Sequence, residues 1–250
     1  MTRRIVVTGG ATGIGLAVAR SFLDERPDLI LVGRRRDRLD AAAAELDATG
    51  SGSTISTRSC DLRDPDAVQS LADDLSGGAP LDALVLNAGG TADAEPDTDG
   101  LAAVASEWRA NFDLNVVTTV LLTEALLPHL ARPGGRIVSM SSVAGLRGAG
   151  AYGAAKAAVN GWTWWMSGRL AADGITVNAV APGFVPDTEF WTDRIAANPG
   201  LPADRTAGIP MQRPGTPTEV AEAVAYLASP DAGWTTGQIL GINGGVVLGR

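Results

Sequence analysis

The sequence predicts a single α/β domain whose parallel sheet is doubly wound, with helices on both of its faces. Short apolar runs alternate with helical stretches along the whole chain, which is typical of right-handed βαβ units. The first apolar run, Ile5-Val6-Val7, leads directly into a glycine-rich turn and a helical stretch. The 250 residues, 45% of them hydrophobic, suffice for one complete core.

The alternation places each element in order. The expected strands are residues 4–8, 29–33, 54–59, 82–87, 135–141, 175–180 and 238–242, and the expected helices are 13–25, 36–48, 65–75, 106–131, 151–172 and 217–228. Two helix starts carry capping signals, Asp64 before Pro65 and the capping-box spacing from Thr216 to Glu219. Residues 90–100 are polar and acidic and predict a surface loop without site chemistry.

Composition excludes several classes of function. The chain has 28 acidic and 20 basic side chains, a net charge of −8, and no basic stripe that would favour nucleic acid. Cys60 is the single cysteine, and metal-ligand clusters are absent. No apolar run approaches the roughly 18 residues of a membrane helix, and the first strand leaves no room for a signal peptide. We expect a cytoplasmic protein with no membrane partner, a packed Cys60 and a surface His129.

The glycine-rich turn is residues 8–15, with the sequence TGGATGIG. Glycines allow positive φ and let a pyrophosphate approach the backbone, while the following helix offers its N–H groups to the phosphates. Strand, glycine turn and helix in this order predict a dinucleotide site. An ordinary glycine-rich βα turn is the alternative.

The end of the second strand indicates which dinucleotide binds. An acid at this place would accept hydrogen bonds from a ribose 2′-OH, but the sequence has Gly33, Arg34 and Arg35. Guanidinium groups bind a phosphate in fork geometry, so the pattern favours NADP(H). The alternative is that these arginines only solvate a helix start, where positive charge is unfavourable.

Tyr152 and Lys156 stand four residues apart in an alanine-rich helical stretch. Positions i and i+4 share one face, so the lysine lies beside the phenol and favours its ionised form. Free tyrosine has a pKa of about 10, too high for proton exchange near neutral pH. The pair therefore predicts a proton-transferring tyrosine, although the same spacing also occurs by chance on solvated helices.

Taken together, the motifs resemble the short-chain dehydrogenase/reductase family in its form of about 250 residues. The resemblance runs from Thr8 to Gly245, and its order and spacing are specific. Besides the glycine turn and the Tyr152–Lys156 pair it includes Asp61, Asn87-Ala88-Gly89, Asn115, Ser139-Met140-Ser141-Ser142, Asn178, Pro182-Gly183, Thr236-Gly237-Gln238 and Asn243-Gly244-Gly245. It implies a Rossmann fold that transfers hydride between a nicotinamide cofactor and a carbonyl.

The resemblance also implies roles for single residues. Tyr152 is then the general acid, Lys156 lowers its pKa and binds the nicotinamide ribose, and Ser142 holds the substrate oxygen. Asn115 positions a water that links Lys156 to solvent, or else only satisfies local backbone. The implied cofactor contacts are Thr8, Gly9, Thr12, Gly13, Ile14, Gly15, Arg34, Arg35, Asp61, Leu62, Asn87, Ala88, Gly89, Tyr152, Lys156, Pro182, Gly183, Val185 and Thr188.

Two positions depart from the family pattern. Ten residues separate Ser142 from Tyr152, about three fewer than usual, whereas Ser139 has the usual separation of 13. The place of Ser142 at the strand end still makes it the better match. Asp187 stands where the family has a threonine, so Thr188 or a backbone amide is expected to make the carboxamide contact.

Residues 187–214 combine apolar side chains with several prolines and predict a substrate lid, or a plain surface helix pair. We expect an NADP(H)-dependent carbonyl reductase or alcohol dehydrogenase acting on a largely apolar ketone or secondary alcohol. One alternative is a 3-oxoacyl-thioester reductase, with Arg132, Arg136, Arg147 and Arg169 as a carrier-protein docking face. Another is a non-catalytic dinucleotide sensor or scaffold.

Three tryptophans lie within four positions of the helix expected at 151–172. Core packing explains Trp162, and the spacing puts Trp165 on the same stripe, with Trp164 facing elsewhere. Trp164 and Trp165 cannot both join Trp162 on the core face. Because an outward tryptophan is typical of an interface, we expect a homotetramer or homodimer that pairs through this helix.

Overall fold

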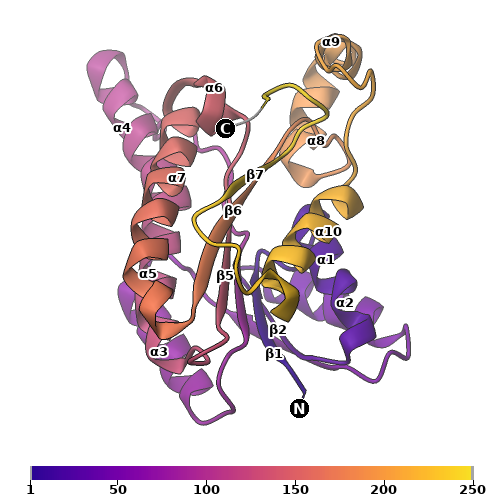
Figure 1. Ribbon diagram of the computed structural model, residues 1–250. Coiled ribbons are helices and arrows are strands. Elements are labelled where there is room, and N and C mark those ends of the chain that lie inside the picture. The colour runs from indigo at the N-terminus through magenta and orange to yellow at the C-terminus, as the bar shows by residue number, and fades with distance from the viewer. Residues whose placement is uncertain (1, 249–250) are drawn as a thin grey trace.

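The structure is a computed structural model that describes residues 2–248. Its centre is a parallel sheet of order β3-β2-β1-β4-β5-β6-β7 (Figure 1). The strands are β1 (Arg4–Thr8), β2 (Asp28–Gly33), β3 (Thr54–Ser59), β4 (Ala83–Leu86), β5 (Arg136–Met140), β6 (Thr176–Pro182) and β7 (Ile239–Ile242). The strand order reverses direction between β1 and β4, where ligands bind in open α/β sheets.

Helices cover both faces of the sheet. They are α1 (Gly13–Ser21), α2 (Arg36–Asp47), α3 (Pro65–Ser76), α4 (Gly100–Phe112), α5 (Thr118–Leu126), α6 (Ala144–Arg147), α7 (Gly150–Leu170), α8 (Glu189–Ala197), α9 (Leu201–Ala207) and α10 (Pro217–Ala228). Figure 1 shows α1, α2 and α10 on one face and α3, α5 and α7 on the other. Helices α6, α8 and α9 lie beyond the carboxyl ends of the strands. The class of fold expected from the sequence is confirmed.

The sheet is buried on both faces because successive side chains of a strand point to opposite sides. In β1, Ile5 and Val7 pack with the side chains of α1, α2 and α10. Val6, between them, packs in a second core with α3, α5 and α7. Each of these three side chains is fully buried.

The seven expected strands are all present, with ends that differ by at most two residues. Asp64 caps α3 with Pro65 following it, and Thr216 and Glu219 form the expected capping box at the start of α10. The helix expected at 106–131 begins earlier, at Gly100, and contains a π-helical turn, Asp113–Val117. Helices α6, α8 and α9 were not expected as separate elements.

The helical run Gly100–His129 bears on the expectation that no stretch is long and apolar enough to cross a membrane. An 18-residue window of this run has a mean hydropathy of 1.2, and by length and composition alone the run could cross a membrane. The expectation that no stretch would meet that criterion is therefore wrong. Core helices of soluble proteins meet it as well, and 44% of the apolar window is buried in this fold, where the run packs against α3 and α7.

Candidate active site

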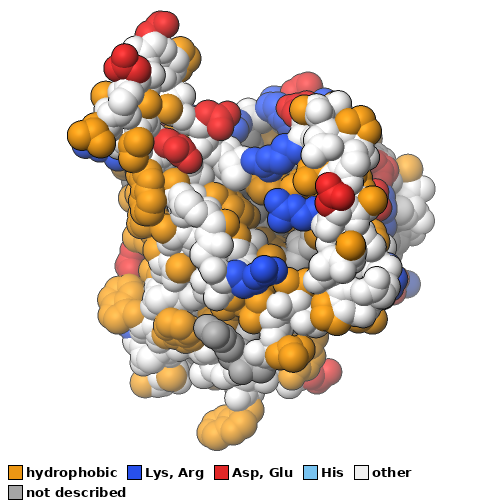
Figure 2. Space-filling view, turned by 90° about the horizontal axis from the view of Figure 1, so that it is seen from above, with side chains coloured by type: hydrophobic (Ala, Val, Ile, Leu, Met, Phe, Trp, Pro, Cys, Tyr) orange, Lys and Arg blue, Asp and Glu red, His pale blue; other side chains and the backbone are white. Residues whose placement is uncertain are grey.

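A cleft of about 400 Å³ opens at the carboxyl ends of the strands. Seen from above, the molecule is hollowed there, and basic side chains border the hollow (Figure 2). The expected site residues that line the cleft are Gly9, Thr12, Gly13, Ile14, Gly15, Arg34, Arg35, Asp61, Leu62, Asn87, Ala88, Gly89, Ser142, Tyr152, Lys156, Pro182, Gly183 and Thr188. Positions far apart in the sequence therefore form one continuous surface.

Three expected site residues do not line this cleft. Thr8 is buried, and its Oγ1 accepts a hydrogen bond from the Ala88 N–H at 2.9 Å, so it ties the glycine turn to the end of β4. Val185 packs in the core that includes α10. Asn115 lies behind the cleft wall. The side chains of Thr8 and Val185 do not line the cleft, and their contact with the cofactor stays a prediction.

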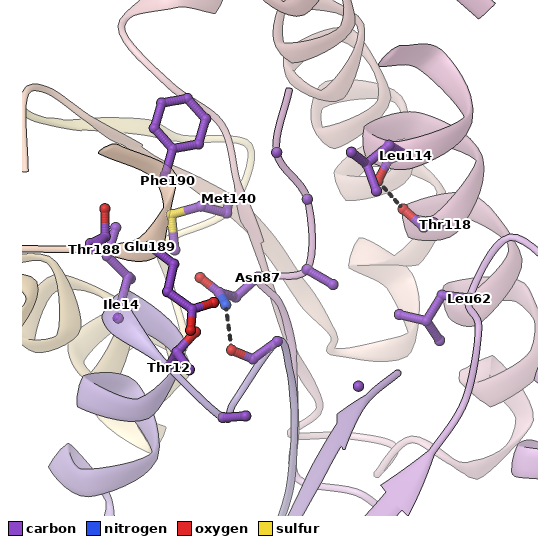
Figure 3. Close-up of a pocket in the computed structure, with 18 of the residues that line it drawn as sticks. Thr12, Ile14, Leu62, Asn87, Leu114, Thr118, Met140, Thr188, Glu189 and Phe190 are labelled. Atoms are coloured by element: carbon purple, nitrogen blue, oxygen red, sulfur yellow. Dashed lines mark hydrogen bonds between the residues drawn. The ribbon is translucent and has the colours of Figure 1, made fainter. Parts of the chain in front are cut away.

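The glycine turn is closed against β4 by Asn87. Its Nδ2 donates to the carbonyl oxygens of Thr8 and Gly9, at 3.0 and 3.2 Å. Figure 3 shows Asn87 with one of these bonds. A Cβ on Gly15 would lie 2.0 Å from the Gly9 oxygen, and Gly9 itself has a φ of +62°. The turn therefore admits no side chain at either position and leaves its backbone open to a phosphate.

Basic side chains gather at the end of β2. Arg34, Arg35 and Arg38 line the cleft beside Gly33. Asp61, across from them at the end of β3, is held by two hydrogen bonds from Arg63, at 3.0 and 2.6 Å. The Arg63 guanidinium lowers the pKa of this carboxyl to about 2, despite the opposing effect of burial, so Asp61 stays ionised.

Tyr152 and Lys156 both project from α7 into the cleft. Burial raises the pKa of the Tyr152 phenol, while a hydrogen bond with Ser142 and the charge of Arg194 lower it. Lys156 is buried, its Nζ donates to the carbonyl oxygen of Met140 at 2.8 Å, and burial lowers its pKa to about 8. The expected lowering of the tyrosine pKa by Lys156 is thus wrong for this geometry, in which the lysine lies 5.8 Å from the ring centroid.

The structure separates the candidate serines. Ser142 lines the cleft, and its Oγ accepts from the Ala144 N–H at 3.1 Å. Ser139 is fully buried in β5 and bonds to Thr163 at 3.1 Å. The short loop before Tyr152 contains only α6, and it still brings Ser142 to the phenol. The geometry favours Ser142 over Ser139.

Asn115 sits in the π-helical turn and is satisfied by backbone. Its Nδ2 donates to the oxygens of Gly90 and Asn111, and its Oδ1 accepts from the Gly90 N–H. A Cβ on Gly89 would lie 2.6 Å from Asn115 Oδ1 and 3.1 Å from Lys156 Nζ, so Gly89 is what separates the two polar groups. Gly90 also lines the cleft, so the start of the loop expected at residues 90–100 borders the site.

Helix α8 covers the tyrosine with an aromatic side chain. The Phe190 ring lies 5.6 Å from the Tyr152 ring, and Trp191 packs edge-on against Phe190 and Phe184. Arg194 stacks 4.4 Å from the Phe190 ring and donates to Thr91 Oγ1 across the opening. Residues 187–214 thus contain two short helices, α8 and α9, and α8 places Phe190 against Tyr152.

Before α8, Thr188 rather than Asp187 reaches the cleft. The Thr188 side chain lies about 3.3 Å from where a Cβ of Gly13 would be, next to the glycine turn. Sequence reasoning missed Glu189 and Phe190, which also line the cleft (Figure 3). Phe190 is one of the apolar side chains of residues 187–214, but nothing in the linear sequence places it over Tyr152.

The residues expected to serve packing are mostly confirmed. Cys60 is buried, and burial raises its pKa to about 11, which leaves the thiol unreactive. Trp162 is 9% exposed, whereas Trp164 and Trp165 are 57% and 59% exposed. Trp165 therefore does not share the buried stripe of Trp162, contrary to the spacing argument.

By fold and by site, this is a dinucleotide-binding α/β protein. A family model described as Enoyl-(Acyl carrier protein) reductase matches residues 9–247. Cis-4-hydroxycyclohexanecarboxylate dehydrogenase of Sinomonas cyclohexanicum is 38% identical, over 97% of this chain and 96% of that protein. The 3-oxoacyl-(acyl-carrier-protein) reductase of Synechocystis sp. is 35% identical, again over 97% of this chain and 96% of that protein. The chain belongs to the short-chain dehydrogenase/reductase family and is an oxidoreductase of that family.

A solved structure agrees with this assignment. The Pseudomonas aeruginosa RhlG/NADP active-site complex is 31% identical and superimposes with a TM-score of 0.86, covering 98% of this chain and 96% of that one. The resemblance stated from the motifs is confirmed, and it extends over nearly the whole length.

Proposed function

We propose that the protein is an NADP(H)-dependent carbonyl reductase whose substrate is a largely apolar ketone, or the matching secondary alcohol in the reverse direction. The observation that carries this proposal is the position of the Tyr152 phenol. It lies under the Phe190 ring at the end of the cofactor cleft, and the Ser142 hydroxyl lowers its pKa. The Tyr152 phenol can donate a proton, the Ser142 hydroxyl can hold the carbonyl oxygen, and the Phe190 ring covers the phenol with apolar surface.

The cleft residues fit the cofactor. The backbone of Gly9 and Gly15 leaves a cradle that a Cβ would fill, as a pyrophosphate requires. Arg34 and Arg35 follow β2 where an acid would otherwise select a ribose 2′-OH. The related RhlG structure is described as an NADP complex, which supports the same choice. When bound, NADPH supplies the hydride.

Tyr152 delivers the proton to the carbonyl oxygen. Because burial raises its pKa, the phenol keeps its proton at neutral pH and is in the form that reduction needs. Ser142 holds the carbonyl oxygen and stabilises the charge that develops there. Lys156 binds the nicotinamide ribose. Asn115 lies near Lys156, on the other side of Gly89, where it can position a water that links the lysine to solvent, as the family resemblance implies.

Helix α8 and the segment to residue 214 act as the substrate lid. Phe190, Trp191 and Phe184 form a connected aromatic surface that begins at Tyr152. Such a surface binds an apolar group and excludes water from the reacting carbonyl.

A 3-oxoacyl-thioester reductase is the second candidate, supported by the name of the Synechocystis relative. It would need a basic face for an acidic carrier protein. Two of the four arginines considered for that face are already paired, Arg132 with Asp173 and Arg169 with Glu124. Arg136 is buried and donates hydrogen bonds to backbone oxygens. Within residues 2–248, only Arg147 of the four is both exposed and without an acidic partner, so this proposal is the weaker one.

A substrate panel distinguishes the candidates. NADPH oxidation is followed with apolar ketones, small keto acids and 3-oxoacyl thioesters, and Tyr152→Phe serves as the control for background oxidation. We expect the apolar ketones to give the highest kcat/KM. Faster turnover of small charged keto acids contradicts the apolar lid, and preference for thioesters selects the second candidate. A panel in which no carbonyl reacts, with NADPH still bound, supports a non-catalytic sensor.

A further inference from the structure

Glu189 forms an ion pair that crosses the cofactor cleft. It is the first residue of α8, and its carboxylate lies 2.6 Å from an Arg35 guanidinium nitrogen and 3.7 Å from one of Arg38. Arg35 and Arg38 belong to the opposite wall, after β2. Figure 3 shows the Glu189 side chain extending from the lid segment among the residues that line the cleft.

The position of this acid bears on cofactor choice. Arg35 lies where a 2′-phosphate would be bound, yet its guanidinium is already paired with a carboxylate. Carboxylate and phosphate use the same N–H donors of a guanidinium, so they compete for it. All three side chains are about half exposed, so the pair is weak enough to be exchanged.

Glu189 is also adjacent in sequence to Phe190, which contacts the catalytic tyrosine. Phe190 follows Glu189 directly and packs on Tyr152. Thr188, which precedes it, lies against Gly13 of the glycine turn. Glu189 therefore stands between the residue beside the glycine turn and the residue whose ring covers the phenol.

We propose that Glu189 is a specificity-determining residue that competes with the 2′-phosphate of the cofactor for Arg35 and Arg38. Binding of NADPH exchanges the carboxylate for the 2′-phosphate on Arg35 and Arg38 and releases the start of α8. NADH has no phosphate to make this exchange and leaves the ion pair in place. The inference rests on the proposed use of NADP(H).

The first test measures cofactor affinity by fluorescence titration of NADPH and NADH. Glu189→Gln removes the competing charge, so the ratio of NADH Kd to NADPH Kd is expected to rise roughly three- to tenfold, or about 0.7–1.4 kcal/mol. Glu45→Gln is the matched control, because Glu45 is a similarly exposed partner of Arg20 away from the cleft. It should leave the ratio unchanged.

The outcomes separate the two proposals. A wild type that prefers NADPH, with an unchanged or lower ratio in Glu189→Gln, overturns the role of Glu189 and leaves NADP(H) use standing. A wild type with equal affinity for both cofactors overturns the NADP(H) assignment, and the inference fails with it.

The second test isolates the release of α8. Hydrogen exchange of the amides in residues 189–197 is compared with 2′,5′-ADP and with 5′-AMP, which differ only in the 2′-phosphate. In the wild type we expect faster exchange with 2′,5′-ADP than with 5′-AMP, and in Glu189→Gln no difference between them. Equal exchange with the two nucleotides in the wild type overturns the release step.

Discussion

Lys156 donates a hydrogen bond from Nζ to the carbonyl oxygen of Met140, at 2.8 Å, and this bond directs the ammonium toward the end of β5. The lysine is therefore buried beside the tyrosine without acting on it directly. Its burial disfavours the charged form, and its pKa falls from 10.5 to about 8. The free energy of unfolding should therefore depend on the protonation state of Lys156.

The stability of the protein should depend on pH through Lys156. Between about pH 8 and 10.5 the unfolded chain holds a proton that the folded chain has lost, so the contribution of Lys156 becomes more favourable as pH rises. Below pH 8 its burial penalty is fully present. Relative to Lys156→Met, the wild type should gain stability of order 1–3 kcal/mol across this window. Urea unfolding of both proteins at pH 7 and 10 measures it, and a constant difference contradicts the shifted pKa.

Tyr152→Phe should lose turnover by roughly 10²–10⁴-fold, because only the transferable proton is removed. NADPH affinity should change little. Single-turnover reduction and fluorescence titration of the same preparations measure the two effects. A variant that keeps a tenth of the wild-type rate would exclude Tyr152 as the general acid.

The two serines provide a paired experiment. Ser142→Ala removes the hydroxyl that lines the cleft and should lower kcat, whereas Ser139→Ala removes a buried bond to Thr163 and should mainly lower stability, by about 1 kcal/mol. Steady-state kinetics and thermal unfolding are recorded for both variants. If Ser139→Ala proves the more damaging to kcat, the choice of Ser142 is wrong.

The pH profile should respond to Arg194. Its charge lowers the pKa of Tyr152, so Arg194→Gln should shift the alkaline limb of alcohol oxidation to higher pH, and Arg194→Lys should shift it less. Arg205→Gln is a matched control, since Arg205 stacks on Trp191 but is not among the charges acting on Tyr152. Identical profiles for Arg194→Gln and the wild type would show that α8 exerts no charge effect on the phenol.

Much of the fold follows from local pattern, and the site only in part. The strands were predictable because a parallel strand buried on both faces is a short apolar run, as in residues 5–7. The glycine turn was predictable because it is contiguous in sequence. The pairing of Glu189 with Arg35 spans 154 residues, and no local pattern encodes it. The direction of Lys156 was missed because helical spacing fixes its face but not the carbonyl to which it bonds.

The exposed tryptophans of α7 indicate a contact between subunits. Trp164 and Trp165 are 57% and 59% exposed, and α4, which packs against α7, exposes apolar side chains such as Leu101. Exposed tryptophans of this kind are typical of a protein interface, so we propose a homotetramer that pairs through α7 and, at a second contact, near the exposed Trp234.

Light scattering at micromolar concentration tests this arrangement. The double variant Trp164→Glu, Trp165→Glu should reduce the tetramer to a dimer, because charged side chains cannot be buried unpaired in the α7 contact while the second contact remains. Met211→Glu is the control: Met211 is 60% exposed on the lid segment and should leave the assembly unchanged. A wild-type monomer refutes the oligomer, and a wild-type dimer refutes the tetramer. A double variant that stays tetrameric shows that positions 164 and 165 are not buried in a contact, and it refutes the assignment of α7 as the interface.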